Sequence, residues 1–195
     1  MRELYFSRHG ITDDLENGIR NRFDAKLTPV GHEEARATGE QLLARFIIPQ
    51  LVVCSRLPRA IQTAENIAEV IGYDKEDIVQ SDLLNERDCG IAKGMKNAEI
   101  RRLYPGGFDT VPNAESTEAA QERAAYAAEW LESLPEDVVL VVGHGVSGRA
   151  IARHYMNLPY TEEFNPEVRE VTNLRNGQIM QLVPGPVQLL PLEKT

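Results

Sequence analysis

The most constraining feature of this sequence is a run of five aliphatic residues at positions 138–142, Val-Val-Leu-Val-Val. A strand that is apolar at every position must be covered on both faces, which is typical of a central strand in a parallel sheet. Shorter apolar runs at residues 4–7 and 51–54 predict two more strands. The rest of the chain must therefore supply helices for both faces of that sheet.

Helix patterns lie between these runs. Thr28-Pro29 predicts a helix start, because Thr is a good N-cap and Pro fits the first helical position. The apolar face expected for that helix consists of residues at helical spacing, namely Ala35, Gly39, Leu42, Leu43 and Phe46. Further helices are expected at residues 58–71, where Gly72 is the C-terminal stop, and at residues 97–104, 116–133 and 146–156.

The last part of the chain predicts antiparallel pairing. Asn176-Gly177, a strong hairpin signal, separates strand-like residues 169–174 from residues 178–183. A shorter strand is expected at residues 77–80. The pattern as a whole predicts an α/β fold, a three-layer α/β/α sandwich with a mostly parallel central sheet and antiparallel edge strands. At this length we expect residues 1–195 to form a single domain.

Composition excludes several classes of protein. The formal net charge of −9 disfavours a nucleic-acid partner. We expect no membrane span, because the sequence has no stretch of about 18 apolar residues, and no signal peptide at the N-terminus. Cys54 and Cys89 form no CxxC pair, so we expect reduced thiols and a cytoplasmic location. A homodimer is left open.

Polar residues follow each predicted strand, where α/β sheets place their ligand sites. Arg8-His9-Gly10 follows the first strand, and residues 55–59, which end in Arg59, follow the second. Gly143-His144-Gly145 follows the central strand, and residues 84–87 follow the short one. The remaining histidines of the four, His32 and His154, fall within helices and are expected to be surface or packing residues.

This set of side chains suits a phosphate ester. Arginine offers a rigid fork of donors that matches phosphate oxygens, and a neutral imidazole can attack phosphorus. Arg8 and Arg59 disfavour a nearby imidazolium, so they should lower the pKa of His9 and keep its lone pair available. We therefore expect a small phosphorylated substrate, with no metal and no other cofactor.

Six ordered segments resemble the motifs of the histidine phosphatase superfamily, the phosphoglycerate mutase-like proteins. They are residues 8–12, 27–31, 55–64, 84–90, 115–123 and 142–145. The resemblance covers most of the chain. It implies that His9 is the nucleophile that becomes phosphohistidine, and that Arg8, Arg59 and His144 clamp the phosphate. Glu86 would protonate the leaving oxygen and then deprotonate the attacking water.

The chain departs from the family pattern near the first motif. Where the family often carries an asparagine, this sequence has Leu15, and Asn17 lies two positions further on. We expect either that Asn17 supplies the missing phosphate contact from a reshaped loop or that this contact is absent. Arg56 and Arg87 are additional charges near the motifs, and we expect surface or salt-bridge roles for them.

Four alternatives stay open beside a phosphomonoester hydrolase. A phosphoglycerate-type phosphomutase shares the motifs, but such mutases typically carry extra segments that close over the site. A catalytically silent member would only bind a phosphorylated ligand or a partner. Residues 145–149 nearly match the GxSxG pattern around Ser147, which would suit a serine hydrolase. A metallohydrolase would use His9, His144 and Glu86, although arginines there would repel a dication.

Overall fold

A computed structural model describes residues 2–158 and 173–191 of the chain. Its centre is a six-stranded sheet with the order β3-β2-β4-β1-β5-β6. The strands are β1 (Glu3–Arg8), β2 (Leu51–Ser55), β3 (Val79–Ser81), β4 (Val138–Gly143), β5 (Ile179–Val183) and β6 (Gln188–Leu189). The first four pair in parallel, whereas β5 runs antiparallel to β1 and to β6.

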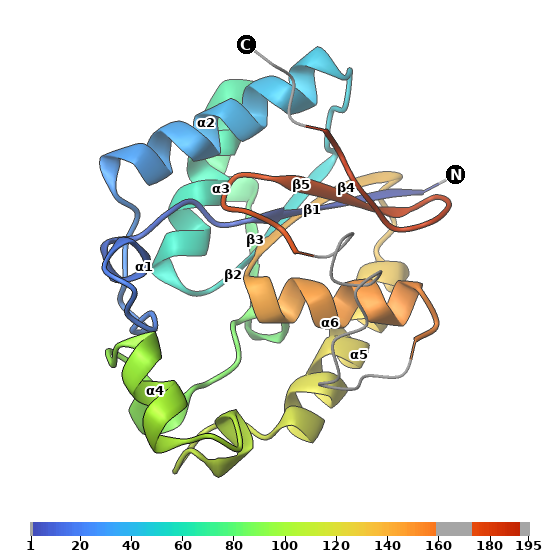
Figure 1. Ribbon diagram of the computed structural model, residues 1–195. Coiled ribbons are helices and arrows are strands. Elements are labelled where there is room, and N and C mark those ends of the chain that lie inside the picture. The colour runs from blue at the N-terminus through green and yellow to red at the C-terminus, as the bar shows by residue number, and fades with distance from the viewer. Residues whose placement is uncertain (1, 159–172, 192–195) are drawn as a thin grey trace.

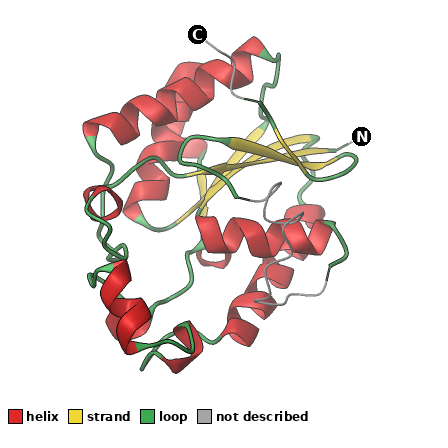
Figure 2. Cartoon of the chain, viewed as in Figure 1, coloured by secondary structure: helices red, strands yellow, loops and turns green. Residues whose placement is uncertain are grey.

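Helices cover both faces of this sheet. Helices α2 (Pro29–Ala44) and α3 (Pro58–Ile71) pack on one face, and α5 (Thr117–Ser133) and α6 (Gly145–Tyr155) pack on the other (Figure 1). Figure 2 shows the three layers as red helices on either side of yellow strands. Two short helices, α1 (Asp13–Glu16) and α4 (Asn97–Leu103), lie in the loops at one end. The predicted α/β/α architecture is confirmed.

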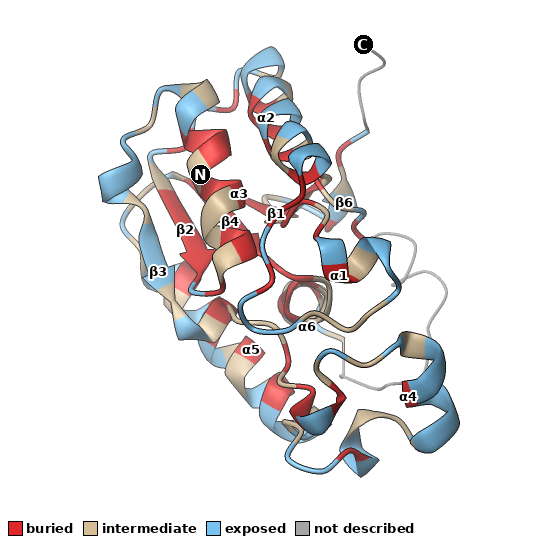
Figure 3. Ribbon diagram, turned by 90° about the vertical axis from the view of Figure 1, so that its left-hand side faces the viewer, coloured by how far each residue is buried: buried red, intermediate tan, exposed pale blue. Residues whose placement is uncertain are grey.

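Strand β4 has the two buried faces that its sequence predicts. Val139 and Val141 belong to the cluster under α5 and α6, whereas Leu140 and Val142 belong to the cluster under α2 and α3. All four side chains are fully buried. Figure 3 shows buried residues along the strands and exposed ones over much of α4. Within the described residues, no helix is both long and apolar enough to cross a membrane.

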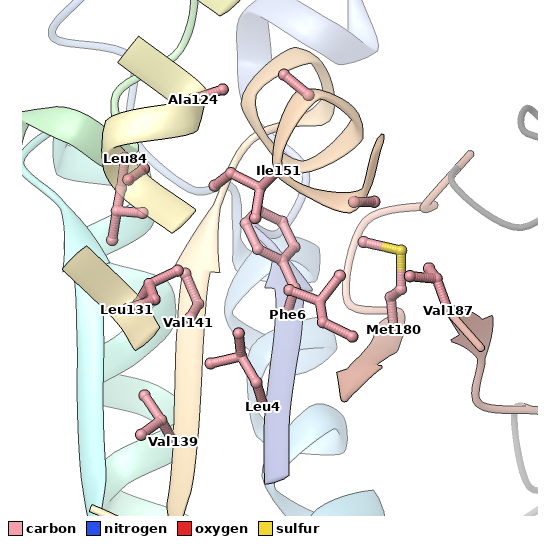
Figure 4. Packing of buried hydrophobic residues seen from close by; sticks show 14 of the residues in the cluster. Leu4, Phe6, Leu84, Ala124, Leu131, Val139, Val141, Ile151, Met180 and Val187 are labelled. Carbon is pink, nitrogen blue, oxygen red and sulfur yellow. The ribbon is translucent and has the colours of Figure 1, made fainter. Parts of the chain in front are cut away.

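Phe6 fixes the distance between β1 and the start of α6. Its ring lies in the core beside Ile151 (Figure 4). A Cβ atom built on Gly148 would lie 2.6 Å from the ring, and one on Gly143 would lie 2.7 Å from it. Only glycine fits at both positions, so the end of β4 and the first turn of α6 can approach β1 closely.

The predicted apolar face of α2 is partly wrong. Ala35, Gly39 and Leu42 are buried, but Leu43 is 41% exposed and Phe46 is 90% exposed. The helix ends at Ala44, and Phe46 has a φ of 58°, so the helical spacing does not extend to it. Ile47, at 9% exposure, enters the core instead.

The expected hairpin at Asn176-Gly177 is also corrected. Residues 169–172 lie outside the described residues, and Asn173 and Leu174 are in no strand. Strand β5 pairs with β1 and β6 instead. The short strand expected at residues 77–80 begins at Val79, because Lys75–Asp77 form a 3-10 turn.

Candidate active site

A pocket opens at the carboxyl ends of β1 and β2. Its lining residues are Arg8, His9, Leu15, Arg20, Asn21, Phe23, Leu57, Arg59, Glu86, Arg87, Cys89 and Lys93. We call Arg8, His9, Arg59 and the adjoining His144 the floor. We call Arg20, Phe23, Glu86, Arg87, Cys89 and Lys93 the outer wall.

The two imidazoles of the floor lie side by side. The ring centroids of His9 and His144 are 5.1 Å apart, and the planes are tilted by 59°. Both residues are buried, at 2% and 0% exposure, and each directly follows a strand of the parallel pair β1 and β4. The prediction that strand ends bring these two histidines together is therefore confirmed.

His9 is held in one tautomer. Its Nδ1 lies 2.7 Å from the carbonyl oxygen of Gly10. A carbonyl can only accept, so Nδ1 carries the proton and Nε2 keeps a lone pair. Burial, followed by the positive charges of Arg59 and Arg8, keeps the pKa of His9 well below its ordinary value. The arginine effect was predicted, but the larger contribution, burial, could not be read from the sequence.

Gly10 lets the loop that carries His9 lie against the start of α2. A Cβ atom on Gly10 would lie 2.3 Å from the carbonyl oxygen of Gly31, and one on Gly31 would lie 2.2 Å from that of Ile11. Backbone contact of this kind leaves no room for a side chain on either residue. The glycines of two separate sequence motifs thus form one contact that places His9.

His144 is held in the opposite way. The hydroxyl of Ser55 donates to Oδ1 of Asn85 at 2.7 Å, so it must accept from Nε2 of His144 at 2.8 Å. A neutral His144 therefore has its lone pair on Nδ1, which is buried and has no hydrogen-bond partner among the described residues. Burial, with Arg59 as the next cause, keeps the pKa of His144 well below its ordinary value.

The arginines of the floor also have unused donors. Arg59 is 2% exposed and lies in the first turn of α3, and one terminal nitrogen donates to the carbonyl of Arg22 at 3.1 Å. Arg8 donates to the carbonyl of Leu174 at 2.9 Å. The Nε atoms of both arginines are buried without a partner among the described residues. Burial lowers the pKa of Arg59 to about 10, so it stays charged at neutral pH.

Glu86 lines the same pocket as the residues of the floor. Its carboxylate accepts from the backbone nitrogens of Val146 and Ser147 at the start of α6, at 3.2 to 3.3 Å. These contacts place a carboxyl group on the same pocket as His9 and within electrostatic reach of Arg8 and Arg59.

A half-buried network holds the loop that carries Glu86. Arg123 forms a two-pronged contact with the carboxylate of Glu115, at 2.9 and 2.8 Å. It also donates to the carbonyls of Leu83 and Asn85, at 3.0 and 2.7 Å. The motif at residues 115–123 therefore positions the acidic loop and contributes no group to the pocket lining.

The structure does not bring Asn17 into the pocket. Its side chain is exposed, caps α1 and donates to the carbonyl of Asp13 at 2.8 Å. Asn21 lines the pocket instead, and its Oδ1 accepts from the hydroxyl of Thr12 at 2.7 Å. Sequence reasoning missed Asn21, because the loop around α1 is not built on a regular repeat.

Arg56 and Arg87 form salt bridges, as expected. Arg56 contacts Asp82 at 3.4 Å on the surface. The side chain of Arg87 is only 5% exposed, contacts Asp109 at 2.7 Å and lines the pocket. Burial of Arg87 was not predicted.

The other hydrolase patterns find different explanations. The hydroxyl of Ser147 accepts from the backbone nitrogen of His144 at 3.3 Å, so it caps α6. His32 contacts the side-chain nitrogen of Asn66 at 2.9 Å. Across residues 2–158 and 173–191, no three or more His, Cys, Asp or Glu form a group that could hold a metal ion. Both cysteines are free and buried.

Comparisons with known proteins agree on one family. The family model of the histidine phosphatase superfamily (branch 1) matches residues 4–178. The uncharacterized phosphatase PhoE of Bacillus subtilis is 35% identical over 146 residues, which cover 74% of this chain and 72% of that protein. A 2,3-bisphosphoglycerate-dependent phosphoglycerate mutase of Mesorhizobium japonicum is 31% identical over 163 residues, covering 77% and 79%.

A solved structure is similar over almost its whole length. Mycobacterial glucosyl-3-phosphoglycerate phosphatase, in complex with VO3, has a TM-score of 0.77 and 26% sequence identity. The match covers 97% of each chain. Relatives of both kinds, phosphatases and mutases, thus share this sequence pattern.

Proposed function

Because this chain belongs to the histidine phosphatase superfamily, we propose that it hydrolyses phosphate monoesters of small metabolites through a phosphohistidine intermediate. One observation carries the proposal. His9 is locked with its lone pair on Nε2, beside a second imidazole and two arginines whose buried Nε atoms have no partner among the described residues. Such unsatisfied donors suit an anion with several oxygens.

The first half-reaction transfers the phosphoryl group to the protein. Nε2 of His9 attacks phosphorus, and the bond between phosphorus and the ester oxygen breaks. Glu86 delivers a proton to that oxygen, so the alcohol leaves neutral. Arg8 and Arg59 stabilise the charge that is spread over the equatorial oxygens of the phosphoryl group.

His144 changes its role when phosphate binds. Its Nδ1 has a lone pair in the neutral form and would repel a phosphate oxygen. A nearby dianion favours the charged imidazole, so Nδ1 takes up a proton and becomes a donor to the phosphoryl group. Ser55 keeps the ring in place in both states, because it accepts from Nε2 in each.

The second half-reaction uses water. Glu86, now ionised, removes a proton from a water molecule that attacks phosphorus, and the bond to Nε2 of His9 breaks. Inorganic phosphate and neutral His9 are the products, so the cycle returns both groups to their starting states. The identity of the alcohol depends on the outer wall.

Rapid-quench experiments with a radiolabelled phosphate ester test this proposal. The parent protein should give an acid-labile phosphoenzyme within the first turnover. His9→Asn should give none and lower kcat by roughly 10⁴-fold or more. The matched control His32→Asn, which changes a histidine outside the pocket, should keep both signals. Turnover without a phosphoenzyme would contradict the mechanism.

Phosphoryl transfer between two alcohols is the second candidate, favoured by the 31% identity to a phosphoglycerate mutase. The two functions differ in what accepts the phosphoryl group from His9. Adding phosphoglycerate to the trapped phosphoenzyme separates them. Release of inorganic phosphate at an unchanged rate supports hydrolysis, whereas a bisphosphate product supports a mutase.

A further inference from the structure

The pocket contains more positive charge than one phosphoryl group requires. Beyond the two arginines of the floor, the outer wall adds Arg20, Arg87 and Lys93. Arg87 and Lys93 are balanced by acids, since they contact Asp109 at 2.7 Å and Asp88 at 2.6 Å. Arg20 forms no salt bridge within the described part of the chain.

Arg20 is nevertheless firmly placed. Its backbone nitrogen donates to the carbonyl of Met95, and its own carbonyl accepts from Gly94, both at 2.9 Å. Its guanidinium lies 4.7 Å from the centre of the Phe108 ring. Backbone and ring contacts thus hold the side chain at the pocket without neutralising it.

The surroundings of Arg20 are unfavourable for a cation. Its Nε is buried and has no acceptor among the described residues. Burial is the main cause that lowers the pKa of Arg8. The positive charges of Arg149 and Arg20 lower this pKa further, because like charges repel. A desolvated donor near a like charge costs stability. Such an arrangement is typical of a site that binds an anion.

Three apolar side chains share the pocket with Arg20 and the floor. They are Leu15, Phe23 and Leu57. A ligand that reaches from the floor to Arg20 would then contact them with a weakly polar linker between its charged ends. Both carboxylate and phosphate match the donor fork of arginine.

We propose that Arg20 binds a second anionic group of the substrate, a carboxylate or a second phosphate, while the floor holds the phosphoryl group that is transferred. The substrate class is then a compact phosphate ester of an organic acid, or a bisphosphate. The inference rests on the proposed function and makes Arg20 the residue that determines specificity.

Matched aryl esters test this assignment. The parent protein is assayed with 3- and 4-carboxyphenyl phosphate and with the corresponding carbamoylphenyl phosphates, which have the same shape but no charge. A charged ester should show roughly ten- to a hundredfold higher kcat/KM than its neutral counterpart. Arg20→Gln should abolish that preference, because it lowers kcat/KM on the charged ester far more than on the neutral one. The control Arg101→Gln, on an exposed residue of α4, should preserve the preference.

A second arm separates the two anions. Propane-1,3-diol bisphosphate is compared with propane-1,3-diol monophosphate in the same assays. A preference that appears only in this arm assigns the group as phosphate, and one that appears only with the carboxyphenyl esters assigns it as carboxylate.

Equal rates within every pair of both arms in the parent protein would overturn the inference. So would Arg20→Gln slowing both members of a pair alike. If Arg20→Gln does not fold, the parent protein alone provides the test. The ratio of kcat/KM for the charged ester to kcat/KM for the neutral ester should then be above one and should decrease with added salt. If no ester is turned over, the proposed function has failed, whereas calorimetric binding of the same ester pairs to the parent still decides the role of Arg20.

Discussion

The floor of the pocket is held by the ends of β1, β2 and β4, whereas the outer wall depends on ion pairs and on a small apolar cluster of its own. His9 and His144 lie buried just beyond the ends of β1 and β4, with exposures of 2% and 0%. The segment behind the outer wall packs around Cys89, Ala92, Ile100 and Val111. The parts that perform the proposed chemistry are therefore rigid, and the parts that select a substrate rest on contacts that can vary independently.

The largest effect should come from the floor. Arg59→Met removes a buried charge beside the phosphoryl group and should lower kcat/KM for any phosphate monoester by roughly 10³-fold. Arg56→Met, three residues earlier and exposed, should change it by less than about twofold. Steady-state assays with circular dichroism as a folding control measure both. Similar losses of kcat/KM in the two variants would mean that the floor contributes no more to the reaction than an exposed arginine does.

Glu86 belongs to the outer wall, but the proposed mechanism gives it a role in the reaction at the floor. Glu86→Gln should slow alkyl phosphates by roughly 10²-fold or more, because their leaving oxygen needs a proton. 4-Nitrophenyl phosphate should be slowed much less, since its leaving group departs as an anion. The ratio of the two kcat values is the measurement. Equal slowing would contradict the role of Glu86 as an acid.

Replacing Arg123 should give the same dependence on the leaving group as Glu86→Gln, with a smaller loss of kcat. Arg123→Met releases the carbonyls of Leu83 and Asn85 and should let the Glu86 loop shift, at a cost of roughly tenfold in kcat on alkyl phosphates. The loss on 4-nitrophenyl phosphate should be smaller. Lys75→Met, which removes the exposed contact to Glu69, is the matched control. A loss that does not depend on the leaving group would assign Arg123 to general stability.

The smallest effect concerns stability and pH. The pKa values of His9 and His144 are lowered in the folded protein, so only the unfolded chain takes up these protons at about pH 6.5. The free energy of unfolding should therefore decrease below that pH, by about 1.4 kcal/mol per histidine and pH unit. Urea titrations at pH 7 and 5.5 should show a smaller decrease for His9→Asn than for the parent. An identical decrease would contradict the buried neutral state of His9.

The sequence predicted the floor well, because strand ends and glycines are local signals. The apolar run at β4 and the helix from Pro58 to Ile71 were both predicted closely. Residues that follow parallel strands must meet at one edge of the sheet. His9, Arg8, Arg59, Glu86 and His144 could therefore be grouped from their positions in the sequence alone.

The outer wall was predicted poorly, because it has no periodic pattern. Asn17 was chosen for its chemistry, yet the turn at the end of α1 directs it to solvent. Arg20 reaches the pocket through isolated backbone contacts with Met95 and Gly94, and Asn21 contacts the side chain of Thr12. The wrong prediction at Phe46 has a similar cause. Phe46 itself has a positive φ, which interrupts the helical spacing just beyond the end of α2. Such contacts depend on the whole fold and leave no local signature.

The pairing of β1 with both β4 and β5 has a consequence for biosynthesis. Strand β1 occupies an interior position in the sheet, and its two neighbours begin at Val138 and Ile179. Translation must pass residue 138 before β1 gains either partner, so its apolar side chains stay exposed in the nascent chain until then. Chaperone dependence during expression should therefore reflect strand order more than the stability of the folded protein.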